Sequence, residues 1–175
     1  ACAAFLAAGA ILGMLLARHT AWSHGSLLGA HLALNIGGWL GTAIVGTLHT
    51  FYPSLTHSRL AHERLQGPTF IAWCAGVTGL AAGAAFDMAA VVAGGWIALA
   101  LAASMLAVNI VASARASEEP LGLPARLVGT AQLFLVAGLM LALAMLVSEG
   151  ASATPAGDWR AALAVLLVAG WIGMT

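Results

Sequence analysis

The chain has 175 residues, of which 62% are hydrophobic and only 7% are charged, and its mean hydropathy is +0.99. A soluble domain carries about a quarter charged residues because its surface must be solvated. Six arginines balance six acids, which argues against nucleic acid as a partner, since phosphate binding needs a basic surface. We therefore expect an all-α, polytopic transmembrane helical bundle in a lipid bilayer.

Six apolar runs reach or approach the roughly 20 residues that a helix needs to cross the hydrocarbon core. We expect a single transmembrane helical domain over 1–175, with spans at about 1–17, 26–51, 68–86, 91–114, 124–147 and 159–175. The connections between them, including 52–67, are short and contain helix breakers. Because the first and last runs meet the ends of the sequence, we expect the chain to be a fragment of a longer polypeptide.

The arginines are distributed unevenly between the two sides of the predicted bundle. Four arginines flank the second-to-third and fourth-to-fifth connections, and Arg18 and Arg160 flank the others; the four are Arg59, Arg64, Arg115 and Arg126. Because basic connections stay in the cytoplasm, we predict that both visible ends face the cytoplasm of a bacterial-type inner (plasma) membrane.

Small residues predict close helix packing, and one segment occurs twice in similar form. The pairs Gly37–Gly41 and Gly79–Gly83 have the GxxxG spacing that lets helix backbones approach in lipid. Residues 34–42 resemble residues 166–174, which lie 132 positions, or four spans, further on. A parallel structural repeat would produce this similarity, and so would chance in a composition this biased.

The second span is predicted to carry a polar stripe. At 100° per residue its members stay within about 40° of one line; they are His31, Asn35, Gly38, Thr42, Val45 and His49. The two histidines are separated by about 27 Å of helical rise, so they mark opposite membrane edges. Polar groups at this depth usually face a bundle interior or a bound group.

Histidine is a natural membrane-embedded ligand for haem iron, because neutral imidazole brings no net charge. The stripe therefore predicts a haem b site, with His31 and His49 as candidate iron ligands, Asn35 and Thr42 as lining residues, and His24 as a further contact. The third to sixth spans contain no histidine. A second axial imidazole must come from His19 or His24, or from beyond Thr175. Histidines at span ends are also common as interfacial residues, and that interpretation stays open.

Two amides lie inside later spans and suggest a second cofactor. Asn109 and Gln132, together with His49 and Tyr52, could form a polar pocket at the inner membrane edge that suits a quinone carbonyl. Interhelical amide hydrogen bonding would explain Asn109 and Gln132 equally well.

The run from Ala30 to Thr42, followed by 46–49 and Pro53, resembles a motif of haem-copper-oxidase-like membrane proteins. These are subunit I relatives, including membrane domains associated with multicopper oxidase or copper nitrite reductase. The resemblance implies that His31 is a haem ligand near the start of the second helix. The family's sixth helix carries copper-ligand histidines, which 168–173 lacks, so the resemblance implies a haem-binding module and not a complete oxygen reductase.

These features favour a membrane-integral haem b-binding electron-transfer module that passes electrons, for instance from quinol, to a copper or haem redox partner. Such a module would be part of a membrane oxidoreductase. Two other interpretations remain open. One is a non-catalytic accessory or assembly subunit of a respiratory membrane complex, and the other is a transporter for a small molecule or a metal.

Overall fold

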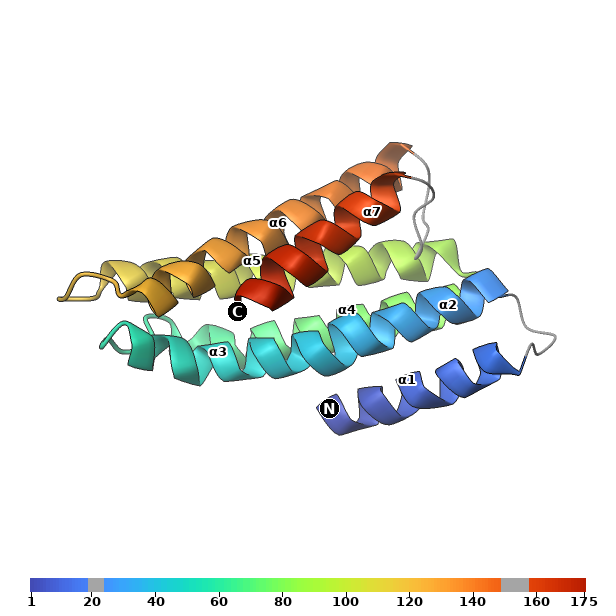
Figure 1. Cartoon of the computed structure of the whole chain (residues 1–175), viewed down its shortest axis with the longest axis horizontal. Coiled ribbons are helices and arrows are strands. Elements are labelled where there is room, and N and C mark those ends of the chain that lie inside the picture. The colour runs from blue at the N-terminus through green and yellow to red at the C-terminus, as the bar shows by residue number, and fades with distance from the viewer. Residues whose placement is uncertain (19–23, 149–157) are drawn as a thin grey trace.

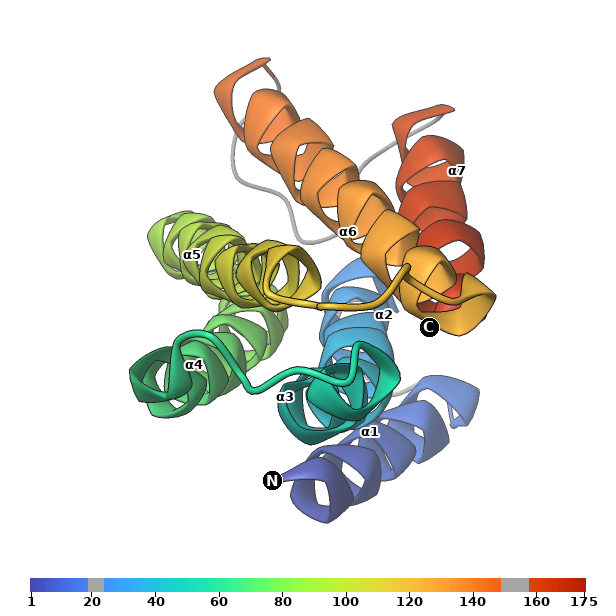
Figure 2. The same ribbon diagram turned by 90° about the vertical axis from the view of Figure 1, so that its left-hand side faces the viewer.

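The computed structural model describes residues 1–18, 24–148 and 158–175, and over these residues the chain is helical without strands. Figures 1 and 2 show the bundle from two directions. The helices in chain order are α1 (Cys2–Ala17), α2 (His24–Leu32), η1 (Ala33–Gly41), α3 (Thr42–Leu55), η2 (Glu63–Leu65), α4 (Gln66–Ala85), α5 (Ala89–Arg115), α6 (Leu123–Ser148), α7 (Asp158–Ala164) and η3 (Val165–Ile172).

Within the described residues, four helices are long and apolar enough to cross a membrane: His24–Leu55, Glu63–Ala85, Ala89–Arg115 and Leu123–Ser148. They match the second to fifth predicted spans, and they are the helices of a multi-pass membrane protein. Cys2–Ala17 and Ala161–Ile172 are shorter apolar helices. The prediction of a connection starting at Tyr52 is wrong, because the helix continues to Leu55 through Pro53. Pro53 has no backbone N–H, so the His49 carbonyl one turn earlier lacks its usual i+4 donor.

The continuous helix α2–η1–α3 occupies the middle of the bundle, with α1 on one side and α4 and α6 on others (Figure 2). Its start is tied to the α4–α5 turn, where the Ser26 hydroxyl donates a 2.8 Å hydrogen bond to Asp87. Its far end lies beside the α5–α6 connection, where the Ser117 hydroxyl donates to the Thr56 carbonyl at 2.8 Å. The second predicted span is thus fixed at both ends of the bundle.

Glycines bring the helix backbones together as the GxxxG spacing predicted. A Cβ at Gly83 would lie 2.7 Å from the Val92 backbone nitrogen, and one at Gly79 would lie 3.3 Å from the Gly95 Cα. A Cβ at Gly41 would lie 2.7 Å from the Trp73 ring. The contacts of Gly83 and Gly41 leave no room for a side chain and that of Gly79 leaves little, so these glycines are packing residues.

The two similar sequence segments also share an unusual local structure. Both η1 (Ala33–Gly41) and η3 (Val165–Ile172) are π-helices, and the start of η3 lies 132 residues after the start of η1. A π-helix uses i→i+5 hydrogen bonds and is rare outside single turns. Its recurrence at the same offset as the sequence similarity favours a structural repeat over chance.

The helices before these π-segments repeat as well. Phe5 packs where a Cβ at Gly38 would be, at 2.8 Å, and Phe134 packs in the same way at Gly170, at 2.5 Å. Gly9, four residues after Phe5, faces Asn35. Gly138, four residues after Phe134, faces Leu167, which is the counterpart of Asn35 at the offset of 132. The hairpins α1–η1 and α6–η3 are therefore two copies of one unit.

Candidate functional site

The predicted polar stripe does not form one face, and this prediction is wrong. A π-helical turn holds about one residue more than an α-helical turn, so η1 puts the residues after it out of phase with those before it. His31, Asn35 and Gly38 consequently face α1. Thr42, Val45 and His49 are buried at 1%, 0% and 4% exposure in the bundle interior. Two separate polar sites result.

The first of these sites is built around His31, at the end of α2 and opposite two glycines of α1. The His31 Nδ1 lies 2.8 Å from the Gly9 carbonyl oxygen. Because a carbonyl can only accept, Nδ1 carries the proton and the Nε2 lone pair is available. A Cβ at Gly13 would lie 3.0 Å from the His31 Cε1, so glycine there leaves the space that the imidazole occupies.

Asn35 supports this histidine from one turn further along the helix. Its Nδ2 donates a 2.8 Å hydrogen bond to the His31 carbonyl and lies 3.3 Å from the His31 Nδ1. Since Nδ1 already donates to Gly9, the Asn35 amide serves as a neighbour that limits rotation of the ring. A ring fixed through its Nδ1–H is the usual arrangement of a metal-ligating histidine.

The remaining predicted histidines cannot bind the same iron as His31. His24 is exposed and begins α2, seven residues and about 10 Å of rise away. His49 is about 27 Å away along the same helix. Two axial imidazoles must approach one iron from opposite sides, and His24 and His49 lie too far along the helix from His31 to do so. His19 lies outside the described residues.

The second site contains His49, the only histidine, acid or base that is buried in the described parts of the chain. Its Nδ1 donates a 2.8 Å hydrogen bond to the Val45 carbonyl, and its Nε2 has no partner among those residues. Thr42, predicted to line a groove, instead donates to the Gly37 carbonyl at 3.4 Å. The same carbonyl accepts from the Trp73 indole at 2.9 Å, so it joins the π-segment to α4.

One of the four residues of the predicted quinone pocket is engaged by the backbone of the loop after α3. Asn109 is occupied, because its Oδ1 accepts from the His62 backbone N–H at 2.9 Å and its Nδ2 donates to the His62 carbonyl at 3.1 Å. It therefore fastens the loop after α3 to α5. Gln132 and Tyr52 are buried at 4% and 1% exposure. A Cβ at Gly129 would lie 3.6 Å from the Tyr52 hydroxyl, so Tyr52 contacts α6.

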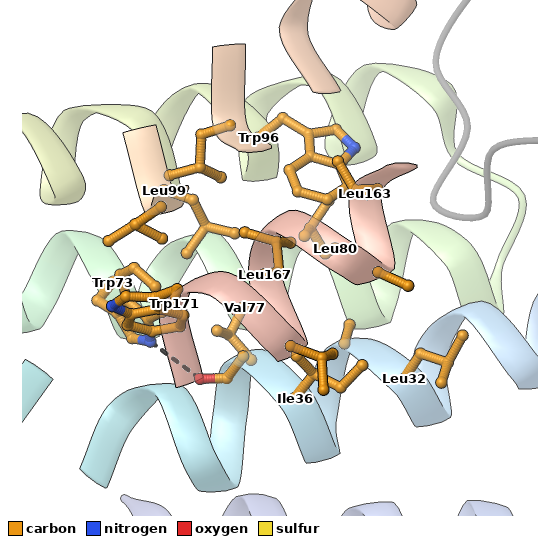
Figure 3. A pocket seen from close by; sticks show the side chains of 16 residues that line it. Leu32, Ile36, Trp73, Val77, Leu80, Trp96, Leu99, Leu163, Leu167 and Trp171 are labelled. Carbon is orange, nitrogen blue, oxygen red and sulfur yellow. Dashed lines mark hydrogen bonds between the residues drawn. The ribbon is translucent and has the colours of Figure 1, made fainter. Parts of the chain in front are cut away.

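A cavity of about 140 Å³ lies between η1, α4, α5, α6 and α7–η3. Figure 3 shows that leucines and tryptophans surround it, among them Leu80, Leu99, Leu167 and Trp171. The lining includes no histidine, acid or base. The cavity lies between the two copies of the repeated hairpin, and because no histidine lines it, it offers haem no axial ligand.

The sequence did not reveal the partners of His31. Gly9 and Gly13 have GxxxG spacing on α1, which is a signal for helix packing but not for a histidine site. Comparison of the two copies of the repeat indicates whether the polar pair is needed for packing. The counterparts of His31 and Asn35 in the second copy are Leu163 and Leu167, so the polar pair is not needed to pack this kind of hairpin.

Comparison with known proteins leaves the class at a multi-pass helical membrane protein. No protein-family description, curated protein or solved structure matches the chain. Among the described residues, no three histidine, cysteine, aspartate or glutamate side chains lie close enough to hold a metal ion together. A haem iron is held mainly by its porphyrin and needs only axial ligands from the protein, and a single histidine can supply one of them.

Proposed function

We propose that the chain is a membrane-integral haem b-binding electron-transfer module, and that His31 is an axial ligand. One observation carries this proposal. The His31 Nδ1–H is fixed on the Gly9 carbonyl at 2.8 Å, which holds the Nε2 lone pair in one orientation. A half-buried imidazole with this tautomer fits an axial ligand, and the missing side chain at Gly13 gives the ring its place.

The difference between the two copies of the repeat also supports a ligand role for His31. At equivalent positions, one hairpin has His31 and Asn35 and the other has Leu163 and Leu167. The leucines achieve packing with apolar side chains alone, as Leu167 does against Gly138. A polar pair inside a membrane span is costly and is usually kept for function. This chemistry supports a ligand role over a packing role for His31.

The proposed module uses one histidine of this chain for each iron. The other axial position would be filled from a further segment or a partner protein, because residues 63–175 contain no histidine. The bound haem would supply one-electron redox chemistry, and the chain would supply its ligand, orientation and apolar surroundings. The electron acceptor in this proposal is a copper or haem protein on the side where α2 begins, and quinol is the donor class.

The test is a reduced-minus-oxidised optical spectrum of the purified protein, produced with ample haem. We expect a b-type α band that is lost in His31→Ala and retained in His24→Ala and His49→Ala. The last two variants are matched controls on the same continuous helix. A wild-type protein without the band would contradict haem binding. A band that survives in His31→Ala would contradict the ligand assignment.

A further inference from the structure

Four buried polar atoms have no hydrogen-bond partner among the described residues. They are His49 Nε2, Thr69 Oγ1, Gln132 Oε1 and Trp171 Nε1, and none of these residues is more than 4% exposed. They come from four different helices: α3, α4, α6 and η3. Buried polar groups in proteins are normally satisfied by protein or by ordered water, so the position of these four atoms relative to one another matters.

The contact between Tyr52 and Gly129 sets the register of α3 against α6. A Cβ at Gly129 would lie 3.6 Å from the Tyr52 hydroxyl. The two helices run in opposite directions (Figure 1). His49 is three residues before Tyr52 and Gln132 is three residues after Gly129, so both lie about one turn from that contact in the same direction. His49 and Gln132 therefore lie at a similar depth.

Two further contacts place Thr69 and Trp171 near the same depth. Phe70, next to Thr69, has a ring atom 3.9 Å from the Cβ position of Gly46. The Trp171 ring lies 3.2 Å from the Cβ position of Gly41. Gly41, Gly46 and His49 span eight residues, or about 12 Å, of one helix. The residues that carry the four unpartnered atoms are therefore anchored along about 12 Å of the bundle's depth, and we call this section the buried polar layer.

The polarity of the four atoms defines what could satisfy them. His49 Nε2 is an acceptor because Nδ1 donates to Val45, and Gln132 Oε1 is an acceptor whose Nε2 donates to the Val128 carbonyl at 3.1 Å. The Trp171 indole can only donate, and the Thr69 hydroxyl can do both. A small molecule that both donates and accepts is required, and water is the smallest of these.

A polar face of α3 connects this layer with the arginine-rich end, which carries Arg59, Arg64, Arg115 and Arg126. Tyr52 and Thr56 follow His49 at i+3 and i+7, and both are 1% exposed. The Thr56 hydroxyl lies 2.7 Å from the Ser58 hydroxyl, and the Ser58 hydroxyl donates to the Ser113 carbonyl at 3.2 Å. This face of α3 therefore carries hydroxyl groups between His49 and that end, and the Thr56–Ser58 pair joins it to α5.

We propose that the buried polar layer binds internal water, and that this water contacts His49. Water would donate to His49 Nε2 and to Gln132 Oε1 and accept from Trp171 Nε1–H, and the Thr69 hydroxyl would join it in either role. Such bridging water typically makes about three hydrogen bonds. The site is formed by α3, α4, α6 and η3 and does not depend on haem at His31.

The test is water-to-protein magnetisation transfer in solid-state NMR, on the full chain in lipid vesicles with ¹⁵N-labelled histidine and tryptophan. Trp73 and Trp171 form a matched pair, because their exposures are 2% and 1% but Trp73 donates to the Gly37 carbonyl. We expect rapid transfer from water to His49 and Trp171, and slow transfer to Trp73. Transfer to His49 and Trp171 no faster than to Trp73 would overturn the proposal.

Variants test which residues hold the water. Thr69→Val with Gln132→Leu should reduce transfer to His49 severalfold, whereas Thr78→Val, an exposed position on the same α4 whose hydroxyl donates to Cys74, should not. His31→Ala should leave the transfer unchanged, so failure of the haem proposal would not mimic failure here. Unchanged transfer in the double variant would contradict the site. So would a co-purified quinone that only the double variant loses, because a quinone ring would then occupy the layer.

Discussion

The His31 imidazole is held by a backbone carbonyl of a neighbouring helix, and this makes its tautomer independent of its own helix. The Gly9 oxygen at 2.8 Å fixes the proton on Nδ1. His49 has the same tautomer through Val45, but its Nε2 lies in the closed interior. The two histidines thus share a protonation pattern and differ in surroundings, which is the physical basis for giving them different roles.

Replacing the His31–Asn35 pair by leucines should leave the fold intact. The second copy of the hairpin already has Leu163 and Leu167 at these positions, and removing both polar partners together is often nearly neutral. We expect the free energy of unfolding of the double variant His31→Leu, Asn35→Leu to lie within about 1 kcal/mol of the wild-type value. Thermal unfolding in detergent checks this. A loss of several kcal/mol would show that the pair is structural.

Glycines at the two equivalent π-helical positions should resist substitution. A Cβ at Gly38 would lie 2.8 Å from Phe5, and one at Gly170 would lie 2.5 Å from Phe134. We expect Gly38→Ala and Gly170→Ala each to destabilise by about 1–3 kcal/mol through overpacking. Gly94→Ala is the control, because no atom lies within 4 Å of its Cβ position, and it should stabilise α5 by about 0.5–1 kcal/mol. Equal effects in all three variants would contradict this packing account.

At the scale of elements, hydropathy alone predicted the four long helices to within a few residues. The π-helical phase change in η1 was not predictable from a 100° periodicity, because that periodicity assumes the α-helix it was used to find. The 100° periodicity therefore predicts one face for the stripe from His31 to His49, although its two halves face α1 and the bundle interior. Thr69 and Trp171 gave no signal either, because their unsatisfied atoms follow from three-dimensional packing.

Deleting one residue from η1 tests whether its extra residue per turn sets the phase of α3. Without Leu40 the segment can revert to α-helix, which turns through the same angle with one residue fewer. Residues 42–55 should then keep their orientation, with Val45 and His49 in the interior. We expect this deletion to cost little thermal stability. The control deletes the exposed Leu101 from α5, which has no extra residue to lose, so the residues after it rotate by about 100° and thermal stability should fall much more. Equal losses in the two variants would contradict this account of η1.

At the scale of the whole molecule, the arginines predict which end of the bundle faces the cytoplasm. Glu118 and Met88 are exposed at opposite ends. With Cys2 and Cys74 replaced by alanine, Glu118→Cys should be protected from a membrane-impermeant maleimide in intact cells, and Met88→Cys should be labelled. Both positions should react once the membrane is opened. The reverse pattern would place the His31 site on the cytoplasmic side and contradict the proposed direction of electron transfer.

The repeat divides the molecule into two hairpins that share a backbone structure and differ in their side chains. Trp171 is 1% exposed and packs against Trp73 with ring centroids 5.3 Å apart, whereas its counterpart Trp39 is 42% exposed. The second hairpin therefore packs on the first through its π-segment, and the first keeps the His31 site on its other side, against α1. Shared architecture thus accounts for the glycines and the π-helices, and it leaves His31 and Asn35 as the residues that need a functional explanation.

Imidazole rescue tests the central assignment most directly. His31→Gly removes the proposed ligand and leaves a space that free imidazole can enter. We predict that the purified variant gives no b-type α band with added haem, that millimolar imidazole restores it, and that imidazole leaves the wild-type band intensity unchanged. A His31→Gly protein that binds haem fully without imidazole would contradict His31 as an axial ligand. So would a variant that folds as the wild type does but is not rescued at any imidazole concentration.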